Sequence, residues 1–440
     1  MTASELAEPR REGRPGPAPG ELRLIVRDRP LSLAEHVDHY GELPAGQPGA
    51  LITEVEQAGL TGRGGGAFPA GRKLRAVAEA SSRARPGRAG VGSVVVANGS
   101  ESEPASSKDS VLLSHAPHLV LDGIALAAGA VGAARAYLCV SHRTGPIARP
   151  LAEAVTERTR AGLSEVPVEV VATAGGYLSG QETALISALN GSAPLPTFVP
   201  PRPAERGAHR RPTLVLNVET LAHIALIGRF GSQWFRTAGT PGAPGSALVT
   251  VGGAVERPGV REIPLGTPLG SVLRRSGLTQ PAQAVLTGGY FGTWLPLPGG
   301  AAVPVSEEGM RAAGAALGPG VLAVLPESAC GLAETARVMS FLAEQSAGQC
   351  GPCRNGLPAL AETMNCLAFG QPGQDTIGWV RQLTGLVAGR GACHLPDGAA
   401  GLVRSALEVF AADVQTHLQA GPCARASRPA VLVIPAGEPR

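Results

Sequence analysis

The sequence predicts an α/β protein that consists of a domain with a mostly parallel sheet, a small β-grasp-like domain and a C-terminal helical bundle. Short β-branched runs alternate with Ala- and Leu-rich stretches between residues 48 and 230, as in a parallel sheet covered by helices. Strand and turn patterns fill residues 245–330, and helical periodicity fills residues 331–420. A chain of 440 residues is also too long for one compact core.

The expected organisation has five parts. Residues 1–20 are rich in Pro, Gly and charge, and we expect a disordered tail there. The α/β domain takes residues 21–240, the β-grasp-like domain 245–330 and the helical bundle 331–420. A second tail, 421–440, contains an apolar run that has no predicted place.

The α/β domain has three expected strands, at residues 93–98, 136–140 and 166–173. Residues 123–140 are the stretch most like a membrane span, but they are short, Gly/Ala-rich and interrupted by Arg135. We therefore expect a packed helix that runs into a strand, and no direct membrane insertion. No apolar region follows Arg10 and Arg11, so no secretory signal is predicted and the expected location is cytoplasmic.

The two later domains follow from turns and periodicity. Residues 245–330 predict a strand, a turn at Arg257-Pro258-Gly259, a second strand, a short helix and a strand pair with a Gly-Gly turn. One helix face of the bundle carries Leu332, Thr335, Val338, Met339 and Leu342. The cysteine segment 345–356 is therefore expected between two helices.

Composition limits the possible functions. A net charge of +3 spread along the chain gives no basic stripe, so nucleic-acid binding has no support. Seven unevenly placed cysteines fit metal or redox use better than a disulfide framework. Aromatic residues make up only 3% of the chain, which makes each of them informative.

Four polar segments of the α/β domain are candidates for a ligand site. The glycine loop, "GLTGRGGGAFPAGRKL" (59–74), would let a phosphate approach the backbone, with Arg63 and Lys73 as cations. Taken alone, it is equally well interpreted as a mobile surface loop. The acidic loop (94–112) follows a strand, where open α/β sheets bind ligands, although a solvated turn is the plainer interpretation. The other two segments are residues 175–191 and 211–224.

Together these segments resemble the NADH-oxidising flavoprotein component of respiratory complex I (the F subunit of NADH-quinone oxidoreductase) and its relatives in NAD-linked hydrogenases and formate dehydrogenases. The resemblance runs over roughly residues 50–410 in the same order. It implies a Rossmann-like FMN-binding domain, a soluble-ligand-binding β-grasp domain and a cluster-binding bundle. The implied activity is that of an NADH dehydrogenase. Hydride passes from NADH to FMN, and single electrons then pass to an iron–sulfur cluster and to another redox subunit or a ferredoxin-like carrier.

The resemblance also implies the cofactor-binding residues. They are Gly62, Arg63, Gly64, Gly65, Phe68, Lys73, Asn98, Glu101, Glu103, Tyr177, Gly180, Gln181, Glu182, Asn217 and Thr220. Of these, Glu103 and Glu182 are expected to position the nicotinamide nucleotide. Three family positions are altered, because Ser100 replaces an aspartate, Gln181 a glutamate and Leu216 an asparagine. A serine still forms hydrogen bonds but brings no charge.

The nicotinamide site departs further from the family. Phe68 matches an aromatic residue that stacks on the nucleotide, a contact that contributes on the order of 1 kcal/mol beyond burial. A second aromatic position falls on Ala76. The family's Lys-Pro-Pro-Phe-Pro element lines up with "VPPRP", so Val199 and Arg202 replace the lysine and the phenylalanine. An arginine at this place still suits a phosphate.

The cluster motif of the family is Ser-Cys-x-x-Cys-x-x-Cys-Arg, with a fourth cysteine roughly forty residues later. The corresponding ligands here are Cys350, Cys353 and Cys393, and Ala347 stands where the first cysteine would be. Several outcomes stay open with three thiolates. They are a [4Fe–4S] cluster completed by Cys366, His394 or water, a [3Fe–4S] cluster, an empty site, and a zinc site that includes His394.

The other three cysteines, Cys139, Cys330 and Cys423, are expected to pack or to stay idle, and Cys330 is the one nearest the start of the bundle.

Two further functions stay open. An FMN protein that has lost NADH use and is reduced by ferredoxin or another donor is suggested by Ala76, Val199 and Arg202. A redox-inactive docking or structural paralogue is suggested by the altered positions Ser100, Gln181, Leu216 and Ala347.

Overall fold

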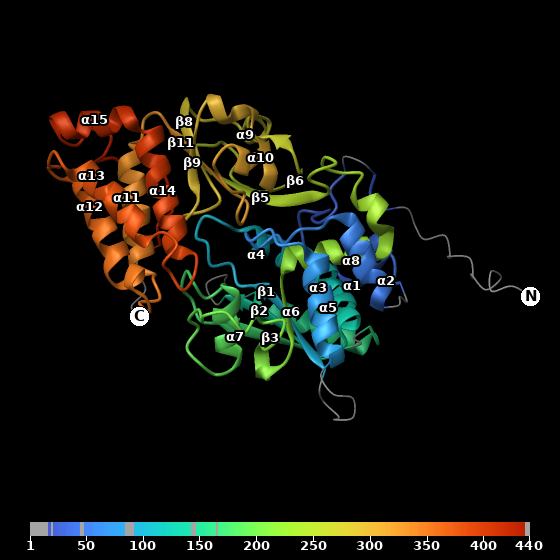
Figure 1. Cartoon of the computed structure of the whole chain (residues 1–440). Helices are drawn as coiled ribbons and strands as arrows, with labels where there is room; N and C mark the ends of the chain where they lie inside the picture. The colour runs from blue at the N-terminus through green and yellow to red at the C-terminus, as the bar shows by residue number, and fades with distance from the viewer. Residues whose placement is uncertain are drawn as a thin grey trace, which may run out of the picture.

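The computed structural model describes residues 16–18, 21–44, 48–83, 92–141, 147–163 and 166–435 (Figure 1). Most of the expected tail 1–20 lies outside the described residues. Its described part lies against Trp234, whose indole N–H donates to the carbonyl oxygen of Pro17 over 3.1 Å.

A four-stranded parallel sheet forms the first part of the chain, in the order β3-β2-β1-β4. Its strands are β1 (Ser93–Gly99), β2 (Ala133–Ser141), β3 (Val168–Thr173) and β4 (Thr213–Asn217). The helices of this part are α1 (Leu33–Tyr40), α2 (Pro48–Ala58), α3 (Ala70–Arg83), α4 (Lys108–His115), α5 (Pro117–Val131), α6 (Ala148–Arg160), α7 (Glu182–Leu189) and α8 (Val218–Phe235). The α/β class and the three expected strands are confirmed.

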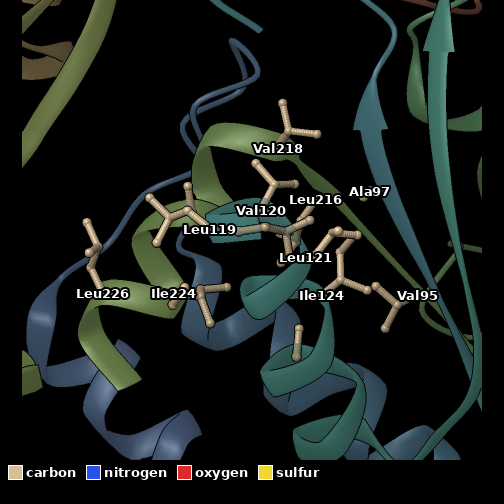
Figure 2. Close-up of a cluster of buried hydrophobic side chains, with 14 of the residues drawn as sticks. Val95, Ala97, Leu119, Val120, Leu121, Ile124, Leu216, Val218, Ile224 and Leu226 are labelled. Carbon is tan, nitrogen blue, oxygen red and sulfur yellow. The ribbon is translucent and has the colours of Figure 1, made fainter. Parts of the chain in front are cut away.

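The core of this part lies where α5 and α8 cross and meet the sheet (Figure 2). Gly123 of α5 lies so close to α8 that a Cβ atom there would stand 2.0 Å from the carbonyl oxygen of Leu221. A glycine therefore permits this helix contact, and the apolar side chains on either side of it fill the core. Ile124 and Leu226, for example, are fully buried, and each burial of this kind stabilises the fold by about 1.5–3 kcal/mol.

The stretch 123–140 forms the end of α5 and most of β2, as the sequence predicts. Within the described part of the chain, each helix taken alone is too short or too polar to cross a membrane. By length and composition, α4 and α5 would pass only as a pair bent by 95°.

A second sheet of five strands has the order β6-β5-β11-β8-β9. Its strands are β5 (Ser246–Gly253), β6 (Gly259–Pro264), β8 (Ala282–Thr287), β9 (Thr293–Pro296) and β11 (Val321–Pro326). Beside it lie α9 (Leu269–Ser276), α10 (Glu307–Ala312) and the short pair β7 (Thr267–Pro268) and β10 (Pro304–Val305). Both expected turns join neighbouring strands. The sequence pattern did not single out β11, which takes the centre, parallel to β5 and antiparallel to β8.

The helical bundle consists of α11 (Gly331–Glu344), α12 (Leu357–Phe369), α13 (Thr376–Val387), α14 (Leu395–Val409) and α15 (Ala411–Ala420). The expected apolar face of α11 is buried. A π-helical turn, Pro352–Gly356, leads into α12, so the cysteine segment lies between two helices as expected.

The described residues after the bundle, 421–435, run back over it. The N–H groups of Val431 and Leu432 donate to the carboxylate of Glu334 over 3.2 and 3.0 Å. Leu432 is buried as well, so the apolar run without a predicted place belongs to the bundle. The boundaries between the domains stay predictions.

Candidate functional site

The carboxyl ends of β1 and β4 lie side by side and carry the first polar residues of the site. Asn98 and Asn217 are partners in the strand register. The amide of Asn217 donates to the backbone oxygen of Asn98 over 3.2 Å, and the amide of Asn98 donates to that of Gly180 over 2.8 Å. In the sheet, β2 lies on one side of β1 and β4 on the other, so the strand order changes direction at β1. The crevice outside these two strand ends is therefore the place where open α/β sheets bind nucleotides.

Lys73 of α3 reaches across this crevice. Its Nζ donates to the Glu182 carboxylate over 2.7 Å and to the carbonyl oxygen of Val215 over 2.9 Å. The side chains of Lys73 and Glu182 are 24% and 32% exposed, so both remain open to a ligand. Gln181, in contrast, uses its side-chain oxygen to cap the first turn of α7. The contacts of Lys73 hold α3, β4 and the start of α7 together.

The glycine loop lies against the end of β4. A Cβ atom on Gly64 would stand 3.1 Å from that of Asn217, and a Cβ atom on Gly66 would meet nothing within 4 Å. Gly65 has a φ angle of +103°, which side chains rarely tolerate. Phe68 is 46% exposed, and the guanidinium carbon of Arg72 lies 5.8 Å from its ring centre. Exposed backbone beside an exposed ring suits a planar, phosphate-bearing ligand.

The guanidinium of Arg63 points away from the crevice into the protein. It donates to the carbonyl oxygen of Ser246 over 3.1 Å and to the hydroxyl of Thr61 over 2.8 Å, and it lies 3.9 Å from the Glu219 carboxylate. Its guanidinium is thus held by protein groups, and the expectation that it contributes a cation to anion binding stays a prediction. Its backbone N–H donates to the hydroxyl of Thr220 over 2.9 Å, which ties the glycine loop to α8.

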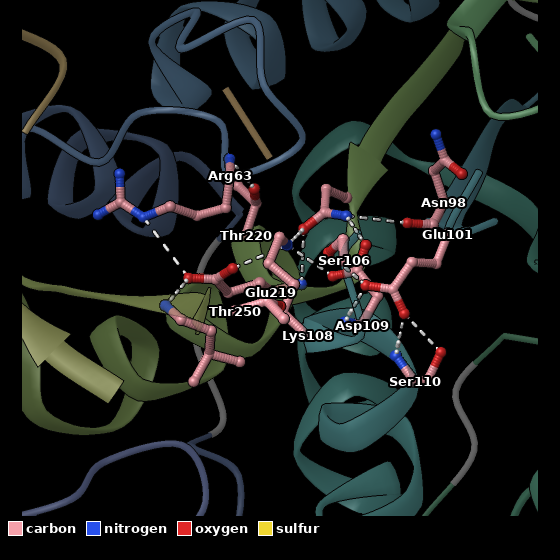
Figure 3. Close-up of polar contacts among 12 residues, drawn as sticks. Arg63, Asn98, Glu101, Ser106, Lys108, Asp109, Ser110, Glu219, Thr220 and Thr250 are labelled. Atoms are coloured by element: carbon pink, nitrogen blue, oxygen red, sulfur yellow. Dashed lines mark hydrogen bonds and ion pairs between the residues drawn. The ribbon is translucent and has the colours of Figure 1, made fainter. Parts of the chain in front are cut away.

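A buried charge network lies beneath the crevice (Figure 3). The Lys108 ammonium lies 2.6 Å from the Asp109 carboxylate and 2.9 Å from that of Glu219. Burial alone would raise the pKa of Glu219, but the charge of Lys108 brings it to about 2. Burial raises the pKa of Asp109 to about 6 in spite of the same charge. The sequence placed Lys108 and Asp109 in the acidic loop but did not assign them to the site.

The acidic loop is packed and hydrogen-bonded, not a solvated turn. The Glu101 carboxylate accepts hydrogen bonds from the Ser106 hydroxyl over 2.6 Å and from the N–H groups of Asp109 and Ser110 over 3.1 and 3.0 Å. It therefore caps the start of α4, where a negative charge is favoured. Ser100, at the altered family position, pairs with the hydroxyl of Thr173 over 3.0 Å.

Glu103 lies where the three parts of the molecule meet. Its carboxylate accepts a hydrogen bond from the Tyr177 hydroxyl and one from the Tyr290 N–H, each over 2.9 Å. The ring of Tyr177 meets Phe341 of α11 edge-on at 5.6 Å. Burial raises the pKa of Glu103 to about 7, although both donors favour its charged form. The sequence did not assign Tyr290 to the site, and the scarcity of aromatic residues was the only signal for it.

The raised pKa of Glu103 predicts a pH-dependent stability. Between about pH 4.5 and about pH 7 the folded chain holds a proton that the unfolded chain has released, so the free energy of unfolding should fall as the pH rises through this range. The full effect is about 3 kcal/mol. Chemical denaturation across this range should show a steeper fall in the wild type than in Glu103→Gln, because Asp109 keeps its own smaller contribution in both proteins.

The matched control for this experiment is Glu79→Gln, which changes a glutamate of α3 that is 55% exposed. It should keep the wild-type pH profile. Parallel profiles for the wild type and Glu103→Gln would contradict the prediction.

The three expected cluster cysteines come together beyond the C-terminal end of α11. The thiols of Cys350 and Cys353 are hydrogen-bonded, and Cys393 is close enough to raise the pKa of Cys353. Burial, the largest contribution, and these neighbours raise that pKa to about 11. Burial would also raise the pKa of Cys350, but N–H donors from Ala392 and Cys353 bring it below its ordinary value. Backbone donors aimed at sulfur stabilise thiolates, which is the form that ligates iron.

The expected substitutes for the missing ligand do not fit. Cys366 lies near the far end of α12, on the order of 15 Å from Cys353. His394 is 93% exposed and pairs with Asp397. Among the described residues, three Cys, His, Asp or Glu ligand atoms lie within 4.8 Å of one another in a different group, Cys330, His417 and Cys423, and not at the cluster cysteines. A single zinc ion bound by the three cysteines and His394 is therefore not supported, and their wider spacing suits the larger iron–sulfur cluster.

The cluster segment also touches the nucleotide side of the molecule. The backbone N–H of Tyr177 donates to the side-chain oxygen of Gln345 over 3.1 Å. Gln345 is the first residue after α11 and stands two positions before Ala347.

A cavity of about 240 Å³ lies on the other side of the glycine loop, toward the second sheet. Its lining includes Thr61, Ala67, Glu307, Arg311 and Leu317. Two of the predicted cofactor-binding residues, Gly62 and Arg63, also line it, whereas Lys73, Asn98 and Glu182 do not.

A nucleotide crevice on a parallel sheet, combined with a bundle that gathers three cysteines, defines an electron-transfer flavoprotein. Two family descriptions match the chain. "Nuo51 FMN-binding domain" matches residues 55–226, and "NADH-ubiquinone oxidoreductase-F iron-sulfur binding region" matches residues 328–417.

Relatives cover most of the chain. The F subunit of NADH-quinone oxidoreductase from Streptomyces coelicolor is 33% identical over 395 residues, which cover 86% of this chain and 84% of the relative. Its counterpart in Mycobacterium bovis is 33% identical over 405 residues, with 88% of each chain covered. Among solved structures, a chain of the NAD+-reducing [NiFe]-hydrogenase in the H2-reduced state has a TM-score of 0.78 and 32% identity over 85% of this chain. The present chain spans 63% of that hydrogenase chain.

The chain belongs to the family of the NADH-quinone oxidoreductase F subunits. The predicted class, an FMN- and iron–sulfur-binding flavoprotein of the complex I type, is thereby confirmed. Its relatives are subunits of larger redox enzymes, so other redox subunits are its expected partners.

Proposed function

We propose that this chain is the NADH-oxidising subunit of a larger redox complex, with FMN in the crevice at the ends of β1 and β4 and an iron–sulfur cluster held by Cys350, Cys353 and Cys393. The observation that carries the proposal is the set of groups gathered at the ends of β1 and β4. Two amide side chains, a partly exposed lysine and an open glycine loop converge there at the carboxyl ends of parallel strands. This donor set suits a nucleotide that bears both a phosphate and a planar ring.

The protein's own residues have distinct roles in this proposal. When bound, FMN supplies hydride acceptance and single-electron release, and the cluster supplies one-electron relay. Lys73 is the cation that the crevice offers to an anionic ligand. The backbone of Gly64–Gly66 lets the cofactor come close, and Thr220 holds that loop in place. Glu103, buried against Tyr177, forms the wall between the crevice and the bundle.

Arg72, one helical turn before the position where the family has a second aromatic residue, supports NADH as the donor. Phe68, Arg72 and Ala76 follow one another at four-residue spacing, and Arg72 and Ala76 are exposed on α3. Positions four apart share one helix face. The Arg72 guanidinium already lies beside the Phe68 ring, and such a group both stacks and binds phosphate.

The test is an anaerobic NADH titration of the full chain, purified with FMN and reconstituted with iron and sulfide. Bleaching of the flavin absorbance, followed by that of the cluster, is the expected result. If the flavin is bleached by reduced ferredoxin but not by NADH, the electron donor is of the ferredoxin type. Ala76 and Val199 suggest this alternative. Protein that binds neither FMN nor iron would support the docking paralogue and end the proposal.

Lys73→Met should weaken FMN binding by about 10- to 100-fold, because a hydrogen bond to a charged group contributes about 1.5–3 kcal/mol. Fluorescence quenching of free FMN on binding measures the affinity. The control is Arg75→Met on the same helix, where Arg75 is 48% exposed and pairs with Glu56 at the surface. Equal affinities for both variants would remove Lys73 from the FMN site.

A ferredoxin-like carrier or another redox subunit is the proposed electron acceptor. All seven cysteines are free thiols in the structure. This supports a reducing compartment, and we place the protein in the cytoplasm.

A further inference from the structure

A second group of metal-type ligands lies at the opposite end of α11 from the cluster cysteines. Cys330 directly precedes α11, His417 lies in α15, and Cys423 follows α15. One ligand atom from each lies within 4.8 Å of the other two. The sulfur of Cys330 is 3.7 Å from Nε2 of His417. Both cysteines pack in the core of the bundle, as the sequence predicts, and the structure also brings His417 beside them.

The imidazole of His417 is held in the state that binds metals. Its Nδ1 lies 2.9 Å from the carbonyl oxygen of Leu367. A carbonyl oxygen only accepts hydrogen bonds, so Nδ1 carries the proton and Nε2 turns a lone pair toward the two sulfurs. Histidine ligands of metals are commonly fixed by such a carbonyl. The N–H of Cys423 also points at Nε2 over 3.1 Å, a contact that a bound ion would replace.

The charges around this group fit a cation with two thiolates. Burial raises the pKa of Cys330 to about 12, so its thiolate needs a positive partner. For Cys423, burial acts in the same direction, but hydrogen bonds led by that of His417 bring its pKa below the ordinary value. Asp413 pairs through Oδ1 with Arg425. Its other oxygen, Oδ2, is buried and has no hydrogen-bond partner among the described residues.

We propose that Cys330, His417 and Cys423 bind a single Zn²⁺ ion, with a water molecule as the fourth ligand. Zinc takes sulfur and nitrogen ligands in tetrahedral sites of this kind. Each thiol gives up its proton to solvent on binding. The ion with two thiolates and a neutral imidazole then carries no net charge, which suits a half-buried site.

The ion would join three separate parts of the bundle. Cys330 fixes the start of α11, His417 fixes α15, and Cys423 begins the segment that runs back over the helices. A structural ion adds its binding free energy to that of folding. This proposal does not depend on the flavin or on the iron–sulfur cluster.

The test measures zinc and iron separately in the full chain produced with both metals. We expect about one zinc ion per chain. Cys423→Ser should lose the zinc and keep the iron, whereas Cys350→Ser should lose the iron and keep the zinc. Cys366→Ser is the matched control in the same bundle and should keep both. Cys423 is half-buried, so serine is tolerated there more readily than at buried Cys330.

A second measurement needs no variant. X-ray absorption at the zinc edge of the wild type should show two sulfur ligands at about 2.3 Å and nitrogen or oxygen at about 2.0 Å. Zinc that survives in Cys423→Ser, or disappears in Cys350→Ser, would overturn the proposal. So would zinc-free protein with a Cys330–Cys423 disulfide by mass spectrometry.

Discussion

Replacing Cys353 with serine should remove the iron from the protein and leave flavin reduction by NADH intact. Cys353 is only 3% exposed and contacts both other cluster cysteines. Because Ala347 supplies no ligand, the variant keeps two thiolates of an incomplete set. Loss of an outer-shell partner already costs about 10- to 100-fold in metal affinity, and loss of a ligand costs more.

Iron analysis and the rate of reduction of a one-electron acceptor measure the effect. Both should collapse, while NADH still bleaches the flavin in a single turnover. Cys366→Ser, on the same bundle but remote from the three cysteines, should behave as wild type. Wild-type iron content in Cys353→Ser would show that the cluster ligands have been misassigned. The reverse substitution, Ala347→Cys, should turn a [3Fe–4S] centre into a [4Fe–4S] centre, which electron paramagnetic resonance distinguishes.

Replacing Lys108 with methionine should destabilise the fold by about 3–5 kcal/mol, as expected when one partner of a buried ion pair is removed. The ammonium is 2% exposed and faces the buried carboxylates of Asp109 and Glu219. Without it, two negative charges are left in the interior, and the Arg63 guanidinium, 3.9 Å from the Glu219 carboxylate, is the remaining cation beside them. Burial would raise the pKa of Glu219, and the charge that now holds it at about 2 would be gone.

Urea denaturation near neutral pH measures the loss. The double variant Lys108→Met with Glu219→Gln should recover part of the stability, because it removes one of the unpaired charges together with the lysine. If the double variant is less stable than Lys108→Met alone, the effect comes from lost packing and not from the charges. Since the network lies beneath Asn217, FMN affinity should fall in parallel with stability.

The fold followed from the sequence where local patterns decide it. The strands at 93–98 and 136–140 are short apolar runs, and Ala- and Leu-rich helical stretches alternate with them along the chain. The central strand β11 (Val321–Pro326) was not singled out, because a single apolar run between glycine-rich turns does not indicate where it pairs.

The site was harder to predict, because spacing says nothing about direction. Arg63 stands among glycines as a phosphate-binding cation would, yet its side chain enters the protein. Glu103 and Tyr290 are far apart in the chain, and only the docking of the second sheet brings them together. The same holds for Cys330 and His417, which no local motif connects.

The hydrogen bond between Tyr177 and Gln345 joins the proposed flavin site to the segment that carries the cluster cysteines. Tyr177 contacts Glu103 beside the crevice, and Gln345 begins the loop that carries the cluster cysteines. The wall of the proposed flavin site and the loop that carries the cluster cysteines are therefore in direct contact. The contacts of Tyr177 with Gln345 and Phe341 thus help to fix the spacing between the two proposed centres, on which the rate of electron tunnelling depends.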